Sequence, residues 1–190
     1  MRVIAGKWGG IRLIFHGQKG VRPTTDRVKE TLFNIISDRL EGARVLDLFA
    51  GTGSWGIEAL SRGAKEAVFV EKSHRMVQNI RENLEKVRCG GNFEIVAQDV
   101  SRFLEKPKMS RERFDIIFAD PPYHLRLGNT VMRALSKQRF LERRGIFILK
   151  HGSAEKLTEI GALKLFRTKK MGETQLSFFE FVENVEGDDA

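Results

Sequence analysis

The tetrapeptide Asp120-Pro121-Pro122-Tyr123 combines an acid, two rigid residues and an aromatic ring within four positions. Each proline fixes φ and removes a backbone N–H donor, so the turn is stiff and its carbonyls are available as acceptors. The Asp120 carboxylate and the Pro121 carbonyl could accept both hydrogens of a planar amine, while the Tyr123 ring stacks on the group that carries it. This turn predicts chemistry at an exocyclic amino group.

A second stretch with a chemical signal is the turn at residues 50–53, Ala-Gly-Thr-Gly, which follows an apolar run at 45–49 and opens a helical pattern. In an open α/β sheet, a ligand binds beyond the carboxyl end of such a strand, where loop amides and the helix N-terminus face it. Gly51, Gly53 and Gly56 also fit the dinucleotide pattern GxGxxG. The loop therefore predicts a small polar ligand.

Two carboxylates bear on the identity of that ligand. Asp47 lies four residues before Gly51, where it would repel a pyrophosphate but would suit the ammonium of a methionine moiety. Glu71 ends the next apolar strand, twenty residues after Gly51, and could accept the ribose hydroxyls of either ligand. We favour S-adenosylmethionine and keep an NAD-dependent dehydrogenase as an alternative.

The elements that must position these residues alternate between strands and helices. Apolar runs at 45–49, 67–70, 93–97, 114–118 and 145–149 predict strands. Amphipathic patterns at 22–40, 54–60, 73–87, 100–104 and 130–135 predict helices, and Thr25 or Asp26 is the candidate cap of the first. Segments 163–166 and 175–182 predict a terminal antiparallel hairpin around Gly172, and residues 2–15 predict a short N-terminal β-hairpin. This order predicts an α/β fold, a Rossmann-like seven-stranded sheet with helices on both faces.

The composition predicts one domain over residues 1–190, with a basic hairpin extension at 1–22 and an acidic tail at 183–190. No apolar run approaches membrane-spanning length and no signal-peptide core is present, so we expect a cytoplasmic protein that uses no membrane. Its one cysteine, Cys89, allows no internal disulfide and no cysteine metal cluster, and we expect no metal.

The charge is uneven along the chain, which carries a net charge of +8 from 33 basic and 25 acidic residues. Residues 1–25 hold five basic side chains before the first acid, and residues 126–150 hold seven basic side chains against Glu142 alone. Both segments flank the predicted site, so a polyanion would meet them first. A solvated basic face is the alternative. Trp8 could stack on a base or fold over its own hairpin.

These motifs together resemble the RsmD family. Five blocks follow in the family's order from Arg2 to about Glu180, namely RVIAGKWGGIRL, RPTTDRVKETLFN, DLFAGTGSWGIEALSRGA, FDIIFADPPY and GETQLSFFE. The resemblance implies a class I methyltransferase fold. It also implies methylation, with S-adenosylmethionine, of the N2 amine of one guanine in small-subunit (16S) ribosomal RNA. We expect a monomer acting on the assembled small subunit, with direct methyl transfer and no metal.

The residues expected to form the site fall into three groups. The catalytic residues are Asp120, Pro121, Pro122 and Tyr123. The cofactor-binding residues are Asp47, Phe49, Ala50, Gly51, Thr52, Gly53, Glu71 and Asp99, where Asp99 could instead cap the helix that follows it. The RNA-binding residues are Arg2, Lys7, Trp8, Arg12, Arg22, Thr24 and Arg126.

Three alternatives to this function remain open. The same tetrapeptide would serve an enzyme that methylates the N6 amine of adenine in nucleic acid, or a glutamine amide. The glycine loop alone would serve an NAD-dependent dehydrogenase. A non-catalytic RNA-binding module would explain the basic charge but would give Asp120-Pro121-Pro122-Tyr123 no purpose.

Overall fold

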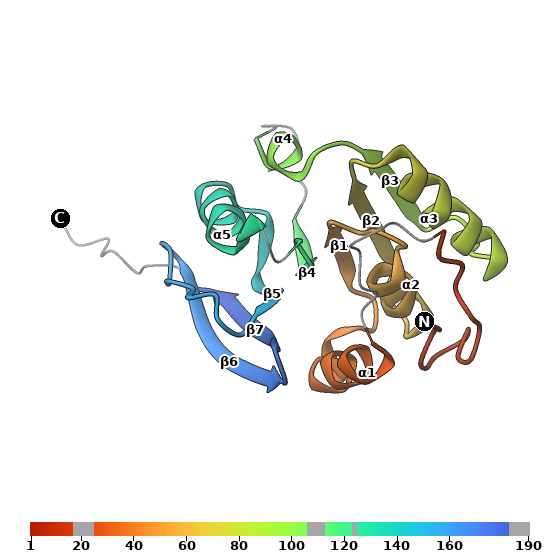
Figure 1. Cartoon of the computed structure of the whole chain (residues 1–190), viewed down its shortest axis with the longest axis horizontal. Coiled ribbons are helices and arrows are strands. Elements are labelled where there is room, and N and C mark those ends of the chain that lie inside the picture. The colour runs from red at the N-terminus through yellow and green to blue at the C-terminus, as the bar shows by residue number, and fades with distance from the viewer. Residues whose placement is uncertain (17–24, 106–112, 123–124, 183–190) are drawn as a thin grey trace.

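The computed structural model describes residues 1–16, 25–105, 113–122 and 125–182 of the chain (Figure 1). A seven-stranded sheet of order β3-β2-β1-β4-β5-β7-β6 forms its centre. The strands are β1 (Arg44–Leu48), β2 (Glu66–Glu71), β3 (Phe93–Ala97), β4 (Phe114–Ala119), β5 (Leu141–Gly152), β6 (Leu163–Met171) and β7 (Thr174–Phe181). The helices are α1 (Asp26–Ile35), α2 (Ser54–Ser61), α3 (His74–Lys86), α4 (Val100–Leu104) and α5 (Gly128–Lys137), with a 3₁₀ turn η1 (Ser37–Arg39). The predicted fold class is confirmed.

The first five strands are parallel, and β7 inserts antiparallel between β5 and the edge strand β6. Apolar side chains of α1, α2 and α3 pack on one face of the sheet, and those of α4 and α5 pack on the other. Parallel strands with both faces covered must be apolar on both sides, which explains the continuous apolar runs in β1 and β4. The strand order reverses at β1 and β4, so a crevice is expected where these two strands end.

Several predicted boundaries were wrong. The helix predicted within 22–40 ends at Ile35 and not at Leu40, whereas its start is confirmed: it begins at Asp26 with the Thr25 hydroxyl as its N-cap. The strands β5 and β6 are longer than predicted, because their outer residues are fixed by pairing with neighbours and not by an apolar pattern. The N-terminal hairpin holds one antiparallel bridge, between Arg2 and Arg12, and no strand ladder.

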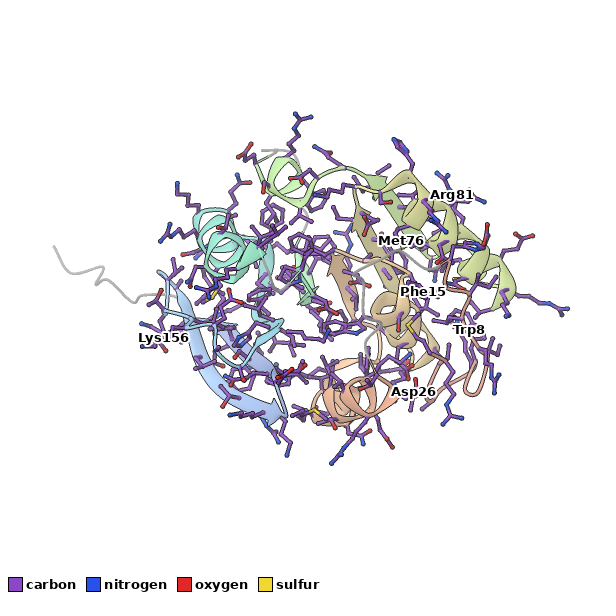
Figure 2. All side chains as sticks on the ribbon, in the orientation of Figure 1. Trp8, Phe15, Asp26, Met76, Arg81 and Lys156 are labelled. Carbon is purple, nitrogen blue, oxygen red and sulfur yellow. The ribbon has the colours of Figure 1, made fainter. Side chains whose placement is uncertain are left out.

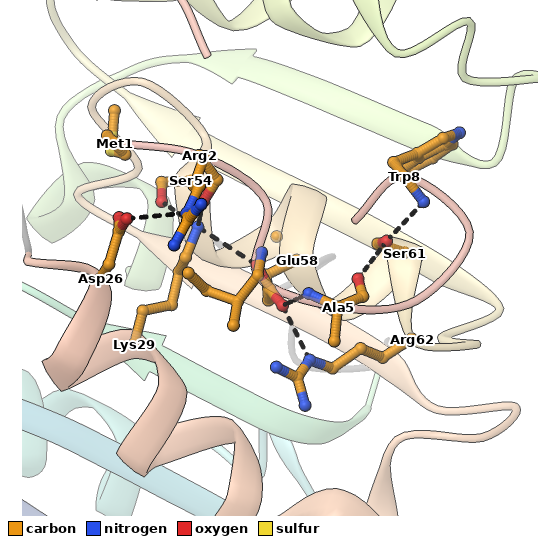
Figure 3. Close-up of polar contacts among 12 residues, drawn as sticks. Met1, Arg2, Ala5, Trp8, Asp26, Lys29, Ser54, Glu58, Ser61 and Arg62 are labelled. Carbon is orange, nitrogen blue, oxygen red and sulfur yellow. Dashed lines mark hydrogen bonds and ion pairs between the residues drawn. The ribbon is translucent and has the colours of Figure 1, made fainter. Parts of the chain in front are cut away.

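The N-terminal strap, residues 1–16, runs alongside α2 and α3 (Figure 1). It is fastened by Glu58 of α2, which is fully buried and accepts from the backbone N–H groups of Ile4 at 2.7 Å and Ala5 at 3.0 Å. The same carboxylate pairs with Lys29 at 3.2 Å and Arg62 at 2.8 Å (Figure 3). Two cations and two amides therefore offset the cost of burying this acid.

Trp8 lies in the turn of the strap, at the opposite end of the molecule from Lys156 (Figure 2). It is 9% exposed and packs into the core, and its backbone N–H donates to the Ser61 hydroxyl at 3.0 Å. Of the two expectations for Trp8, the structure agrees with an indole folded over its own turn. No helix within the described ranges combines the length and the apolarity needed to cross a membrane.

Candidate active site

The glycine loop leaves β1 through a backbone conformation that few residues adopt. Phe49 has φ of 60°, and Gly51 and Gly53 have φ of 56° and 75°. The left-handed region costs a glycine little, whereas an aromatic residue is held there only by its surroundings. The loop is closed by hydrogen bonds from Ala50 N–H to the Val70 carbonyl at 3.1 Å and from Gly53 N–H to the Ala50 carbonyl at 2.8 Å. Such over-determined strain is typical of a binding site.

Asp47 stabilises the glycine loop through a hydrogen bond to the start of α2. It is 3% exposed, and its Oδ2 accepts from the backbone N–H of Gly56 at 2.9 Å, which ties the start of α2 to the end of β1. Burial raises the pKa of Asp47 well above its usual range, and the charges of Asp120 and Glu71 add to the rise. Asp120 and Glu71 therefore both lie near enough to Asp47 to disfavour its charge, and a cation bound beside Asp47 would be stabilised.

The third glycine of the pattern is explained by packing. A Cβ built on Gly56 would lie 2.3 Å from a ring carbon of Phe69, so no larger residue fits between α2 and β2. The GxGxxG match at Gly51, Gly53 and Gly56 thus combines two backbone turns with one close approach of helix to sheet. It does not by itself indicate a dinucleotide.

Glu71 is oriented at the carboxyl end of β2 by two backbone donors. Its Oε2 accepts from Gly51 N–H at 2.9 Å and its Oε1 accepts from Ser73 N–H at 2.8 Å. Each oxygen keeps a second lone pair, so the carboxylate can accept two further hydrogen bonds. A ribose with two adjacent hydroxyls matches this arrangement.

Asp99 caps α4. Its Oδ1 accepts from Ser101 N–H at 2.9 Å, and its Oδ2 lies 3.9 Å from the ammonium of Lys72. The capping role is confirmed, and the role of Asp99 in binding the cofactor stays a prediction. The Asp99 side chain is 45% exposed at the same edge of the sheet as Glu71, because β3 and β2 are parallel neighbours with Glu71 opposite Ala97.

Asp120 follows β4 directly and lies beside the end of β1, where its backbone N–H approaches the Leu48 carbonyl at 3.5 Å. Both carboxylate oxygens accept from the ammonium of Lys150, each at 2.8 Å. Lys150 is 6% exposed and belongs to β5, whose register places Leu149 opposite Ala119. This ion pair fixes the orientation of the acid where β1 and β4 end.

Sequence reasoning missed Lys150. The only local signal was a lysine that ends the apolar run IFIL, directly before His151. His151 is also buried; its Nε2 lies 2.8 Å from the Ser177 hydroxyl, and burial lowers its pKa. Lys150 and His151 are therefore both buried in β5, the strand next to β4 and its predicted catalytic turn.

The remaining part of that turn is described up to Pro122. Pro121 is buried and Pro122 is exposed, and the Pro122 carbonyl accepts from Leu125 N–H at 3.0 Å. Tyr123 lies outside the described residues, as do the predicted RNA-binding residues Arg22 and Thr24. Asp47 and Glu71 thus hydrogen-bond to Gly56 and Gly51, and Asp120 lies beside Leu48 at the end of β1, directly before the glycine loop.

The predicted RNA-binding residues that are described lie on two segments. Arg2, Lys7 and Arg12 are exposed on the N-terminal strap, where Arg2 pairs with Asp26 at 3.1 Å and Lys7 lies 4.2 Å from the Trp8 ring centroid. Arg126 is exposed after the catalytic turn with φ of 45°.

Asn83 connects the strap to the glycine loop, and sequence reasoning missed it. This buried amide donates to the Ile14 carbonyl at 3.1 Å and to the Thr52 carbonyl at 3.0 Å, and its Oδ1 accepts from Ile14 N–H at 2.7 Å. The sulfur of Met1 lies 3.6 Å from the Thr52 hydroxyl. Both ends of the strap therefore meet the loop at one residue.

Comparison with known proteins places this chain in a family. A family model described as "Conserved hypothetical protein 95" matches residues 1–180. "Ribosomal RNA small subunit methyltransferase D" of Haemophilus influenzae is 38% identical over 143 residues, which is 75% of this chain and 74% of that protein. The chain belongs to the RsmD family.

Two further comparisons with known proteins cover almost the whole chain. "Putative rRNA methyltransferase YlbH" of Bacillus subtilis is 34% identical over 181 residues, 95% of this chain and 98% of that protein. A solved structure described as a putative methyltransferase from Escherichia coli superposes with a TM-score of 0.85 at 29% identity, covering 96% of this chain and 98% of that one. RsmD membership confirms the resemblance found in the motifs and argues against the dehydrogenase.

Proposed function

We propose that this chain transfers a methyl group from S-adenosylmethionine to the exocyclic N2 amine of a guanine in small-subunit ribosomal RNA. The observation that carries the proposal is the Asp120 carboxylate, held through both oxygens by Lys150 where β4 ends beside β1 and the glycine loop. The names of its relatives support ribosomal RNA as the substrate class.

The residues around the loop fit S-adenosylmethionine. Glu71 is oriented to accept two hydroxyls, and Asp47 lies buried at the end of β1 beside the loop, where a bound ammonium would favour its charged form. Bound S-adenosylmethionine supplies a sulfonium methyl group, whose bond to sulfur is exchanged for a bond to the amine nitrogen as the amine releases a proton. The role of this part of the chain is to hold its ligand in position, which is the main source of catalysis in such a reaction.

Asp120 selects the group that is methylated. A carboxylate only accepts hydrogen bonds, so it favours an amine that donates and disfavours a carbonyl in the same place. Together with the Pro121 carbonyl it would accept both amine hydrogens and receive the released proton. We assign Lys150 to keep the carboxylate aligned for this contact, and Tyr123 to stack on the base.

The target base must leave its stack to reach this crevice. Flipping a paired or stacked nucleotide costs a few kcal/mol, and basic contacts around the site must offset that cost. Arg2, Lys7, Arg12 and Arg126 are exposed and could supply them. Methylation of an adenine N6 amine is the second candidate, because that amine offers the same two hydrogens.

Asp120→Asn tests the catalytic assignment. We expect methyl transfer to fall by at least about a hundredfold, since the amide removes one acceptor and the charge. Calorimetry should show S-adenosylmethionine binding within about twofold of the unaltered protein, because Glu71 and the loop are unchanged. Turnover near the original rate would exclude Asp120 from the mechanism.

A further inference from the structure

The edge strand β6 has an unusual exposure pattern. Residues 164–170 are all exposed, so the strand is open on both faces instead of alternating between core and solvent. Four of these seven residues are basic and none is acidic, namely Lys164, Arg167, Lys169 and Lys170. Figure 1 shows β6 at the end of the molecule away from the N-terminal strap. The basic charge here is therefore separate from that of the strap.

The strand register places part of this charge in line with the catalytic centre. Lys150 of β5 and Lys169 of β6 are both paired with Leu176 of β7. Residues paired directly across a sheet point to the same face, and neighbouring strands lie about 4.8 Å apart. Lys169 therefore shares a face with Lys150, which holds Asp120, and its Cα lies roughly 10 Å away across two strand spacings.

Arg167 lies two residues before Lys169 on β6, one step further along the same row from the carboxyl end of β5. It and Ile148 are both paired with Phe178, so it shares the face of Lys169. Next to it, a bulge places Phe166 with its ring 6.2 Å from that of Phe178 and leaves Phe166 45% exposed. We call Phe166, Arg167 and Lys169 the β6 row.

The charge of the β6 row is not neutralised by neighbouring acids. Lys164, at the far end of the strand, pairs with Glu159 at 3.5 Å. Within the part of the chain that the structure describes, Arg167 and Lys169 form no ion pair with a carboxylate. Glu173 lies in the β6–β7 turn and Glu180 lies opposite Lys164, so the two acids of this hairpin flank the row at its two ends.

We propose that the β6 row is a docking surface for the RNA backbone beside the flipped nucleotide. The inference rests on the proposed function, because the row is assigned to RNA on the ground that it is aligned with Lys150 and with Asp120, the proposed catalytic acid. Two cations set along one strand match consecutive phosphates, and the exposed Phe166 ring offers a surface on which an unpaired base can stack. Lysines on an edge strand also prevent strand pairing between molecules, so the test must separate the two roles.

A charge-reversal pair makes that separation. Arg167→Glu with Lys169→Glu keeps two charges on the edge, so protection against strand pairing remains, but it repels phosphate. The matched control is Lys65→Glu with Lys86→Glu. This pair changes the net charge by the same amount and is exposed, and it lies directly before β2 and at the end of α3, away from β6.

Binding of unmodified 16S ribosomal RNA is measured by filter retention in S-adenosylhomocysteine over a range of salt concentrations, without turnover. For the β6 pair we expect affinity to weaken about tenfold or more, and the slope of log affinity against log salt to fall by about 1.5. Each phosphate contact accounts for roughly 0.7 to 0.9 of that slope. The control pair should change affinity less than about threefold.

Equal weakening by both pairs would show an effect of net charge alone and would overturn the proposal, as would unchanged affinity in the β6 pair. Calorimetry with S-adenosylmethionine checks that each variant is folded, and Arg167→Gln with Lys169→Gln replaces the β6 pair if that pair does not fold. Since binding is measured without turnover, loss of RNA affinity in the β6 pair supports the surface even if the chain methylates another base. Methyl transfer by the unaltered protein tests the proposed function separately.

Discussion

Removal of the Lys150 ammonium is the perturbation most informative about the catalytic centre. In Lys150→Met the side chain keeps its volume, but Asp120 loses the donor that contacts both its oxygens at 2.8 Å. Removing one partner of a buried ion pair costs about 3 to 5 kcal/mol. The Asp120 side chain is 26% exposed and can be partly hydrated, so we expect a smaller loss of about 2 to 3 kcal/mol. For a chain of this size that corresponds to a decrease in Tm of roughly 5 to 10 °C.

The effect on catalysis is separable from the effect on stability. An acid that turns away by about 1 Å lowers the rate by about a hundredfold, so we expect kcat to fall by that factor at a temperature where the variant is folded. KM for the RNA and the affinity for S-adenosylmethionine should change by less than about threefold, because Glu71 is held by the backbone N–H groups of Gly51 and Ser73. Lys150→Arg keeps the charge and should retain part of the activity.

Two controls make the Lys150 experiment decisive. Lys156→Met removes an exposed ammonium elsewhere on the molecule (Figure 2) and should leave both kcat and Tm unchanged. In a double-mutant cycle, Lys150→Met should have little further effect on kcat once Asp120→Asn is present. An unchanged kcat in Lys150→Met, or additive losses in the double variant, would refute the role of Lys150 as the residue that positions Asp120.

Three further predictions concern the cofactor loop. Glu71→Ala should weaken S-adenosylmethionine binding by roughly tenfold to a hundredfold in calorimetry, and unchanged affinity would contradict the ribose assignment. Asn83→Ala should expose the strap to proteolysis and weaken the same binding by about threefold to tenfold, because Thr52 loses its support; protection equal to the unaltered chain would contradict this coupling. Burial raises the pKa of Asp47, so the unliganded folded protein retains a proton there that the unfolded chain releases. The free energy of unfolding therefore falls increasingly through this acid as pH rises above about 4. Asp47→Asn should make the free energy of unfolding less dependent on pH above that value, and an unaltered pH profile in denaturant titrations would contradict it.

The position of Asp120 could be predicted because the signal is local. An apolar run followed by an acid and two prolines fixes where the strand ends and where the acid lies. Its partner Lys150 could not be predicted, since the contact depends on the register of β4 against β5 across thirty residues of intervening chain. Pairing register is a tertiary property that a periodic pattern within one strand does not contain.

The strap and the edge strand show two other limits. Glu58 is an acid in a short helix, where an acid would ordinarily face solvent. It is fully buried instead, because Lys29 and the strap amides converge on it from distant parts of the chain. The strand β6 was predicted only over 163–166, because seven exposed residues in succession carry no alternation. Its length comes from hydrogen bonding to β7, and only the structure shows it.

The most direct test of the central claim is methyl transfer from labelled S-adenosylmethionine to unmethylated small ribosomal subunits, with naked 16S ribosomal RNA and duplex DNA assayed in parallel. The products are digested and the nucleosides are identified by mass spectrometry. The account predicts that the label is recovered as N2-methylguanosine from ribosomal RNA. Label recovered as N6-methyladenine, or no label in any of the three substrates, would contradict it.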